Sequence, residues 1–167
     1  MGINLIKKRS YPVTSLFPGG FQTPHLAVSG FKAEDALEME DGFDSSSIWR
    51  FSRGIDSASA AGDWLVATLE DSTRAAFAVR LRATAELAGF CVLSSQGETR
   101  VEVGGWFAPR FWNQGMGREL LEALAQRTTD ARGCCPLVAE VDPDNKAACC
   151  LLARTGFVAD GGLWVVG

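Results

Sequence analysis

Histidine, tyrosine and long apolar runs are scarce in this sequence of 167 residues. His25 is the one histidine and Tyr11 the one tyrosine. With a single histidine, a histidine-rich metal site is excluded, and a Ser-His-Asp or Cys-His catalytic system would have to use His25. We therefore predict no metal site, and we expect His25 itself to be structural.

Membrane-spanning and basic segments are also missing. No apolar run approaches the roughly 20 residues that a membrane-spanning helix needs. The opening MGINLIKKRSYPV lacks the apolar core of about 7–15 residues that a signal peptide requires. The net charge of −4 provides no basic surplus, whereas nucleic-acid-binding proteins usually present a basic face. We therefore expect a cytoplasmic protein whose partners are neither a membrane nor a nucleic acid.

The cysteines do not have the spacing of a zinc site. Cys-x-x-Cys pairs are absent, and one of the five cysteines must stay unpaired in any intramolecular disulfide scheme. We expect reduced and mostly buried thiols at all five positions. These positions are Cys91, Cys134, Cys135, Cys149 and Cys150.

Length and composition predict one globular domain. The chain is long enough to bury a core, and its 47% hydrophobic and 22% charged content are ordinary for a soluble protein. Residues 1–22 combine basic residues with two prolines and a Gly-Gly pair, so we expect an N-terminal arm or irregular lead-in. Residues 23–167 are then the domain.

Hydrophobic periodicity predicts strands and helices that alternate only in the second half. This order implies a mixed sheet covered by helices rather than a regular doubly wound array. The expected strands are His25–Val28, Ala75–Leu81, Leu87–Ser94, Arg100–Phe107, Leu137–Val141 and two short ones near Phe157 and at Trp164–Val166. The expected helices begin near Ala33, Ser57, Gly117 and Asn145.

The turn Gly115-Met116-Gly117 lies where the third of these helices begins. A helix start leaves backbone N–H groups unpaired at the positive end of the peptide dipoles. Glycines there let a phosphate approach the backbone, so the turn predicts a phosphate site. A tight strand-to-helix connection without a ligand is the alternative. A Walker loop is excluded because Arg118 follows, and a dinucleotide fingerprint because Leu120 stands where its third glycine belongs.

The context of this turn resembles a known family. The stretch from Glu102 to Glu119, EVGGWFAPRFWNQGMGRE, is similar to the GNAT acetyltransferases, and most similar to the branch of ribosomal-protein-alanine N-acetyltransferases, which read close to EIGYWxxPxYWGxGYATE. Further along, NKAA from Asn145 and ARTGF ending at Phe157 resemble NxxS and EKxGF of that branch. With the Thr23-Pro24-His25-Leu26 opening, the resemblance covers about residues 23–166.

The resemblance implies an α/β (α+β) GNAT fold, with a mixed central sheet of six to seven strands and about four flanking helices. The sheet is expected to split in a V between its fourth and fifth strands, where the acetyl arm of acetyl-CoA would lie. The activity implied is transfer of the acetyl group to a primary amine, by direct attack in a ternary complex. The expected cofactor-binding residues are Gly105, Trp106, Phe107, Trp112, Asn113, Gln114, Gly115, Met116, Gly117, Arg118 and Asn145.

Three positions within these motifs leave alternatives open. Asn113 replaces a glycine, and asparagine tolerates left-handed backbone conformations better than most residues. Asn145 could contact the cofactor, cap the helix that follows it, or do both. Ala148 stands where the branch carries a serine thought to protonate the departing thiolate. Its presence favours the alternative function, a catalytically degenerate acyl-CoA-binding sensor or regulatory protein.

Acetyl transfer to an amine needs a base and donors for a developing oxyanion. Glu102, beside the expected thioester site, is the candidate base, and a structural ion pair with Arg100 or Arg110 is its alternative role. Glu140 on the next strand is a second candidate. Backbone N–H groups around Trp106 are the expected oxyanion donors.

The acidic segment from Glu34 to Asp44 contains no basic residue. If it borders the acceptor pocket, a protein N-terminus or a small cationic amine is the acceptor, and Asp41, Asp44 and Trp49 are the residues that would bind it. A solvated helix face is the alternative. Edge strands and the N-terminal segment are compatible with a homodimer.

Overall fold

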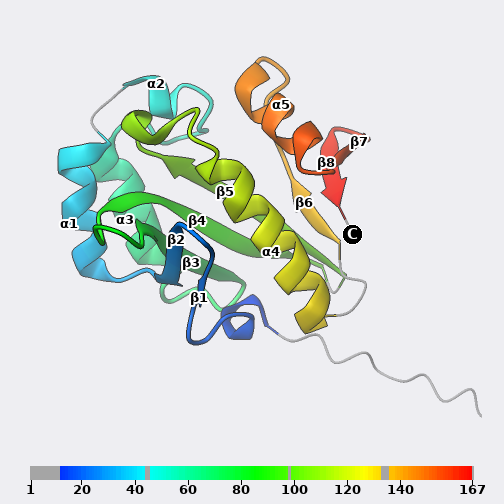
Figure 1. The fold of residues 1–167 in the computed structure, drawn as a ribbon, viewed down its shortest axis with the longest axis horizontal. Coiled ribbons are helices and arrows are strands. Elements are labelled where there is room, and N and C mark those ends of the chain that lie inside the picture. Colours follow the sequence, from blue (N-terminus) through cyan, green and yellow to red (C-terminus); the bar gives the residue numbers. More distant parts are fainter. Residues whose placement is uncertain (1–11, 44–45, 98, 133–135, 167) are drawn as a thin grey trace, which may run out of the picture.

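The computed structural model describes residues 12–43, 46–97, 99–132 and 136–166. In these ranges it contains one mixed sheet of eight strands in the order β1-β2-β3-β4-β5-β6-β8-β7 (Figure 1). The strands are β1 (Phe21–Gln22), β2 (Leu26–Gly30), β3 (Arg74–Leu81), β4 (Leu87–Gln96), β5 (Arg100–Phe107), β6 (Leu137–Ala139), β7 (Val158–Asp160) and β8 (Leu163–Val166). The helices are α1 (Ala33–Gly42), α2 (Ser46–Trp49), α3 (Ala58–Thr68), α4 (Met116–Arg132) and α5 (Lys146–Arg154), with short 3₁₀ turns η1 (Val13–Ser15) and η2 (Pro109–Phe111).

The expected fold class is confirmed, with one strand and one helix beyond the expected numbers. The additional strand, β1, has two residues and pairs with β2, and the additional helix, α2, is a single turn. Both are too short to produce a periodic sequence signal. In the described ranges no helix is both long and apolar enough to cross a membrane.

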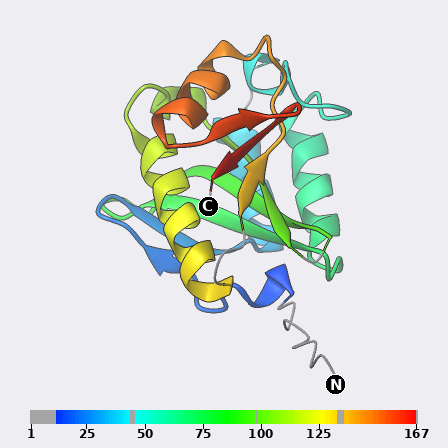
Figure 2. The ribbon, with the colours of Figure 1, turned by 90° about the vertical axis from the view of Figure 1, so that its right-hand side faces the viewer.

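Strand alternation divides the core between the two faces of the sheet. On β4, Cys91 and Leu93 belong to the cluster under α4, whereas Phe90 and Val92 belong to the cluster under α1 and α3. Helix α4 covers one face and α1 and α3 cover the other (Figures 1 and 2).

The described part of the N-terminal segment packs into the domain, although we expected a lead-in. Val13, Leu16, Phe17 and Phe21 are buried in the core cluster under α4. Prolines and glycines between these residues interrupt any helical or strand period, which is why the sequence pattern did not reveal them. The packed part of the chain therefore includes Val13.

The expectation of mostly buried cysteines is correct for one of the three described. Cys91 is buried, and burial raises the pKa of its thiol to about 12. Cys149 is half-buried and Cys150 is exposed on α5, and all three are free thiols. Cys134 and Cys135 lie outside the described residues.

The sheet splits between β5 and β6. β4 and β5 pair antiparallel from Gly89–Phe107 to Gln96–Arg100, along the whole of β5. β5 and β6 pair in parallel at only two positions, Val101–Leu137 and Glu102–Val138. Beyond Glu102 the far edge of β5 therefore faces an opening, and the expected V is confirmed.

Candidate active site

A cleft of about 320 Å³ lies in the split between β5 and β6. One wall is the free edge of β5 from Val103 to Phe107, and the other is Ala139 and Glu140 at the end of β6. Helix α4 contributes Gly117, α5 and its N-cap contribute Ala148 and Asn145, and the segment after α2 contributes Phe51 and Ser52. The cleft therefore joins both faces of the sheet at the point where its pairing stops.

Two successive glycines on β5 have different structural roles. A Cβ at Gly105 would lie 2.4 Å from the carbonyl oxygen of Phe90, so the close approach of β4 requires glycine there. A Cβ at Gly104 would meet nothing within 4 Å. Gly104 therefore leaves open space on the cleft side of the strand, where a larger residue would occupy volume available to a ligand.

The turn before α4 has the geometry of an anion site. Asn113 and Gly115 both have left-handed backbone, with φ of 59° and 82°. The tolerance expected of an asparagine at position 113 is thus realised. Within the described part of the chain, none of the six amide N–H groups from residue 113 to 118 donates to a protein acceptor. Successive unbonded amides at the start of a 17-residue helix form a concavity of positive potential.

Side chains around this turn are held by the protein itself. Trp112 Nε1 donates to the carbonyl of Phe107 at 2.7 Å, and Gln114 Nε2 donates to the carbonyl of Arg110 at 2.5 Å. Arg118 Nε donates to Glu122 at 2.7 Å. These bonds fix the loop while leaving its amides available, so any anion here would be bound mainly by backbone.

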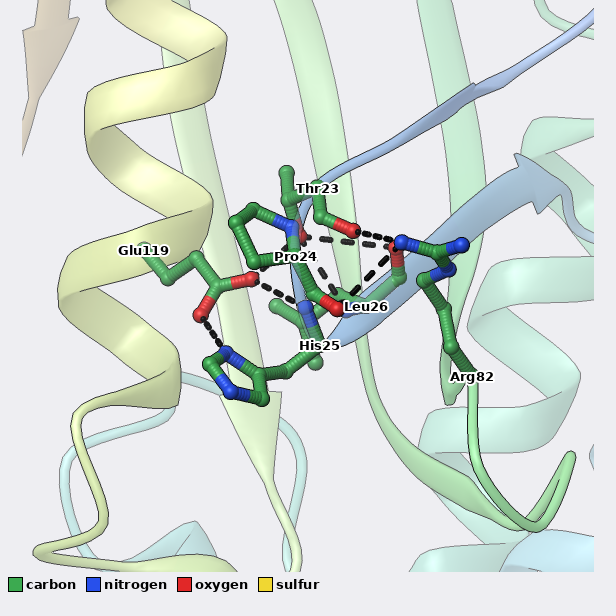
Figure 3. Close-up of polar contacts among 6 residues, drawn as sticks. All are labelled: Thr23, Pro24, His25, Leu26, Arg82 and Glu119. Atoms are coloured by element: carbon green, nitrogen blue, oxygen red, sulfur yellow. Dashed lines mark hydrogen bonds and ion pairs between the residues drawn. The ribbon is translucent and has the colours of Figure 1, made fainter.

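Glu119, in the first turn of α4, is tied to the loop before β2 (Figure 3). Its Oε1 accepts from Thr23 Oγ1 at 2.5 Å and from the His25 amide at 2.8 Å, while its Oε2 lies 2.8 Å from His25 Nδ1. Burial alone would raise the pKa of Glu119, but the hydrogen bonds from Thr23 and His25 together lower it. The structural role expected of His25 is therefore to hold the start of α4.

Trp106 lines the cleft from an aromatic cluster. Its ring centroid lies 4.9 Å from Phe90, 5.8 Å from Trp49 and 6.1 Å from Trp64. Its Nε1 donates to Ser52 Oγ at 2.7 Å. Trp49, which we expected to bind the acceptor, is only 5% exposed and supports Trp106 from behind rather than lining the cleft.

The carboxylates expected to act as bases are placed differently. Glu102 does not line the cleft, and its carboxylate accepts a hydrogen bond from Gln96 Nε2. In the described ranges it pairs with neither Arg100 nor Arg110. Glu140 does line the cleft and lies 3.8 Å from Arg53.

At the start of α5, Asn145 has the capping role that the sequence suggested, and its contact with a cofactor stays a prediction. Its Oδ1 accepts from the amide of Ala148 at 3.2 Å, so it caps the helix, and the residue also lines the cleft. Ala148 lines the cleft too, whereas Cys149 and Cys150 do not. The α5 wall therefore presents no hydroxyl or thiol to the cleft.

Two carboxylates of the acidic segment are paired away from the cleft. Asp35 and Glu38 both pair with Arg80, at 2.6 and 2.8 Å. The hydrogen bonds from Arg80 lower the pKa of Glu38. Asp41 is exposed on α1, and no described residue of this acidic segment lines the cleft. Asp44 lies outside the described residues.

Comparison with known proteins gives one family and many similar structures. The family model described as acetyltransferase (GNAT) domain matches residues 25–158. No curated protein sequence matches the chain. Similar solved structures include a GNAT-family acetyltransferase from Bacillus anthracis, at TM-score 0.77 and 16% identity over 88% of this chain and 97% of that one.

Two further neighbours have named acceptors. A ribosomal-protein-S5-alanine acetyltransferase from Vibrio fischeri aligns at TM-score 0.63 and 18% identity, over 85% of this chain and 84% of that one. A spermidine N-acetyltransferase from Vibrio cholerae, solved with CoA and spermine, aligns at TM-score 0.69 and 16% identity, over 86% and 93%. At such identities the likeness concerns the fold.

Proposed function

Since the chain belongs to the GNAT acetyltransferase family, we propose that it transfers an acetyl group from acetyl-CoA to a primary amine. The observation that carries this proposal is the row of six unbonded amides from residue 113 to 118, which opens beside the cleft between β5 and β6. An anion seated on these amides would place a linear thioester arm within reach of that cleft.

The residues present fit coenzyme A. The amides of residues 113–118 would hold its diphosphate, as helix starts hold phosphates generally. The edge of β5 from Val103 to Phe107 would hydrogen-bond the amide groups of its arm, because β6 does not pair with this edge. The acetyl thioester would supply the electrophilic carbonyl, and backbone N–H groups near Trp106 would stabilise its oxygen.

Glu140 is the carboxylate that we assign as the base. It lines the cleft, whereas Glu102 is bonded to Gln96 outside it. The amine nitrogen forms the new C–N bond, the C–S bond breaks, and the proton lost from nitrogen passes to the Glu140 carboxylate. Ala148 provides no acid for the leaving sulfur. Thiols have pKa values of about 8.5, so a thiolate is an acceptable leaving group near neutral pH.

The second candidate function is an acyl-CoA-binding sensor without turnover, and Ala148 is the observation that favours it. Thiol release from acetyl-CoA, measured with a panel of amines and checked by product mass, separates the two functions. We expect release, and also a rise in melting temperature with CoA alone. A rise in melting temperature with CoA, without thiol release with any amine, would support the sensor. If neither the rise nor the release occurs, both functions are refuted.

The base assignment is tested with Glu140→Gln and Glu102→Gln. A general base contributes about 10²–10⁴-fold to the rate, so we expect Glu140→Gln to lower kcat by at least about 100-fold. The affinity for CoA should stay unchanged in this variant. A comparable loss in Glu102→Gln instead, with Glu140→Gln active, would transfer the role to Glu102.

A further inference from the structure

The charges at the mouth of the cleft point to the chemistry of the acceptor. We propose that the acceptor is a free α-amino acid with an apolar side chain, whose ammonium group lies at Glu140 and whose carboxylate lies at Arg53. This inference rests on the proposed acetyl transfer and names the substrate class of the same cleft.

Glu140, which lines the cleft, forms an ion pair with Arg53, which follows the lining residue Ser52 but does not itself line the cleft. Arg53 comes from the connection between α2 and α3, and Glu140 directly follows β6. Arg53 Nη2 lies 3.8 Å from Glu140 Oε1, and the two side chains are 95% and 58% exposed. So exposed a pair contributes little to stability. It can therefore open at low cost when each group receives a partner of opposite charge.

An α-amino acid is complementary to this pair because it carries an ammonium and a carboxylate on one carbon. The ammonium would meet Glu140, the group that must later accept its proton. The carboxylate would meet Arg53, whose planar guanidinium binds carboxylates with two parallel hydrogen bonds. Ser52 adds a hydroxyl to the same wall, and its oxygen already accepts from Trp106, which orients it.

The cleft beside the ion pair is apolar. Ile48, Phe51 and Trp106 line it on the side of α2. The space beside Gly104 is open, since a Cβ there would meet nothing within 4 Å. An apolar amino-acid side chain placed against these residues gains from burial, at roughly 25 cal/mol per Å². We therefore expect the cleft to prefer amino acids with aliphatic or aromatic side chains.

A polyamine fits this site poorly. The described acidic residues of α1 do not line the cleft, and Asp35 and Glu38 are both already paired with Arg80. Asp142 also lines the cleft, but its Oδ1 already accepts from the Asp144 amide at 2.9 Å. A second positive charge close to Glu140 would be repelled by Arg53. A protein N-terminus would offer Glu140 its ammonium but would leave Arg53 facing a neutral carbonyl.

The reaction also changes the charge of the bound acceptor. Glu140 first takes one proton from the ammonium and passes it to solvent, which leaves a neutral amine with a free lone pair. The amine nitrogen then forms the C–N bond, the C–S bond breaks with its electron pair on the leaving thiolate, and the second proton on nitrogen passes to the Glu140 carboxylate. The N-acetyl amino acid retains its carboxylate but carries no charge on nitrogen. It therefore loses the contact with Glu140 and keeps only the contact with Arg53, which favours its release.

The test compares leucine and phenylalanine with their amides, an alanine-initiated tripeptide and spermidine, using thiol release and product mass. Leucine amide has the same side chain and ammonium as leucine but no carboxylate. We expect kcat/KM for leucine to exceed that for leucine amide by at least tenfold. Arg53→Gln should raise KM for leucine about tenfold while leaving kinetics with the amide within threefold. Arg154→Gln replaces an exposed arginine at the end of α5 that does not line the cleft, so it is the matched control and should change neither.

Three outcomes are distinguishable. Equal or better activity with the amide, the tripeptide or spermidine would overturn the amino-acid assignment while leaving the transferase intact. An equal loss for leucine and its amide in Arg53→Gln would also overturn it, because the arginine would then act on something other than the carboxylate. Thiol release with none of these amines, nor with the broader amine panel, would contradict the proposed function itself.

Discussion

Replacing Glu119 with alanine should detach the loop before β2 from the start of α4. The Glu119 carboxylate is the acceptor for the Thr23 hydroxyl and for the backbone and ring of His25 (Figure 3). These bonds join two segments that are far apart in the sequence, and the α4 end of the tie directly follows the six unbonded amides. The substitution therefore tests what holds the proposed phosphate site in place.

The size of the effect follows from the geometry. A hydrogen bond to a charged group contributes about 1.5–3 kcal/mol, and the Glu119 side chain is 22% exposed. The His25 ring is largely exposed, so its own contact adds little. We expect Glu119→Ala to lower the free energy of unfolding by about 2 kcal/mol. For a domain of this size that is a fall of about 4–8 °C in melting temperature.

The effect should depend on pH with a definite sign. The pKa of Glu119 is lowered in the folded state, because the hydrogen bonds from Thr23 and His25 outweigh its burial. Its stabilisation is then present above the ordinary carboxyl pKa of 4.5 and is lost as the pH falls through the folded-state value. The Glu119 carboxylate should therefore contribute a constant difference in free energy of unfolding between wild type and Glu119→Ala near neutral pH. This difference should shrink on acidification.

Glu122→Ala is the matched control, since it removes a glutamate from the same helix three residues later. Glu122 pairs with Arg118 at 2.7 Å, but both side chains are about half exposed, and exposed pairs at this spacing contribute about 0.3–0.5 kcal/mol. Chemical denaturation of both variants at several pH values gives the comparison. Equal destabilisation by the two variants at neutral pH, or a Glu119 effect that persists unchanged in acid, would refute the reasoning.

Two further predictions concern backbone positions at the site. Gly105→Ala should destabilise the protein by about 1–3 kcal/mol, because its Cβ would lie 2.4 Å from the carbonyl oxygen of Phe90. Gly104→Ala should change the stability by no more than about 0.5 kcal/mol, because its Cβ would meet nothing within 4 Å. Thermal unfolding of the two variants checks this prediction, and equal stabilities would contradict it. Asn113→Gly should retain the affinity for CoA, and Asn113→Val should lower it about tenfold because φ is 59° at this position. Calorimetric titration with CoA measures both affinities. An unchanged affinity in the valine variant would show that the turn does not form the CoA site.

The sequence predicted the backbone of the site better than its side chains. Strand alternation and glycine positions depend on local sequence, so the strand before the turn and the start of α4 were recognisable. The left-handed conformation at Asn113 and the capping by Asn145 also follow from local chemistry, and the structure contains both. The roles that these residues would have toward a cofactor stay predictions.

The position of Glu102 relative to the cleft could not be predicted from the sequence near it. Alternation puts Glu102 on the same face of β5 as Gly104 and Trp106, which do line the cleft. However, β6 still pairs with β5 at Glu102, and the opening begins one residue later. The length of the β5–β6 pairing is set by tertiary packing, so no pattern within β5 could show that Glu102 lies before the opening and does not line the cleft.

The acidic segment shows a similar limit. Its charges suggested an acceptor site, but Arg80 on β3 takes up both Asp35 and Glu38. That pairing joins residues more than forty positions apart, which a charge pattern along one helix cannot reveal. The hydrophobic contribution of Val13 and Leu16 to the core was hidden for a different reason, because nearby prolines and glycines interrupt any helical or strand period.

The two halves of the proposed site depend on different parts of the chain, and this explains why the acceptor cannot be read from the structural neighbours. The cofactor half is built from backbone: unbonded amides before α4 and the free edge of β5. Such features persist when side chains change, provided that the few required glycines remain. The acceptor half is built from side chains on two connections, with Arg53 before α3 and Glu140 after β6. At 16–18% identity the likeness to the neighbours concerns the fold and says nothing of the acceptor side chains. Acceptor specificity therefore has to be argued from Arg53, Glu140 and the apolar wall of this cleft, whatever amine a neighbour uses.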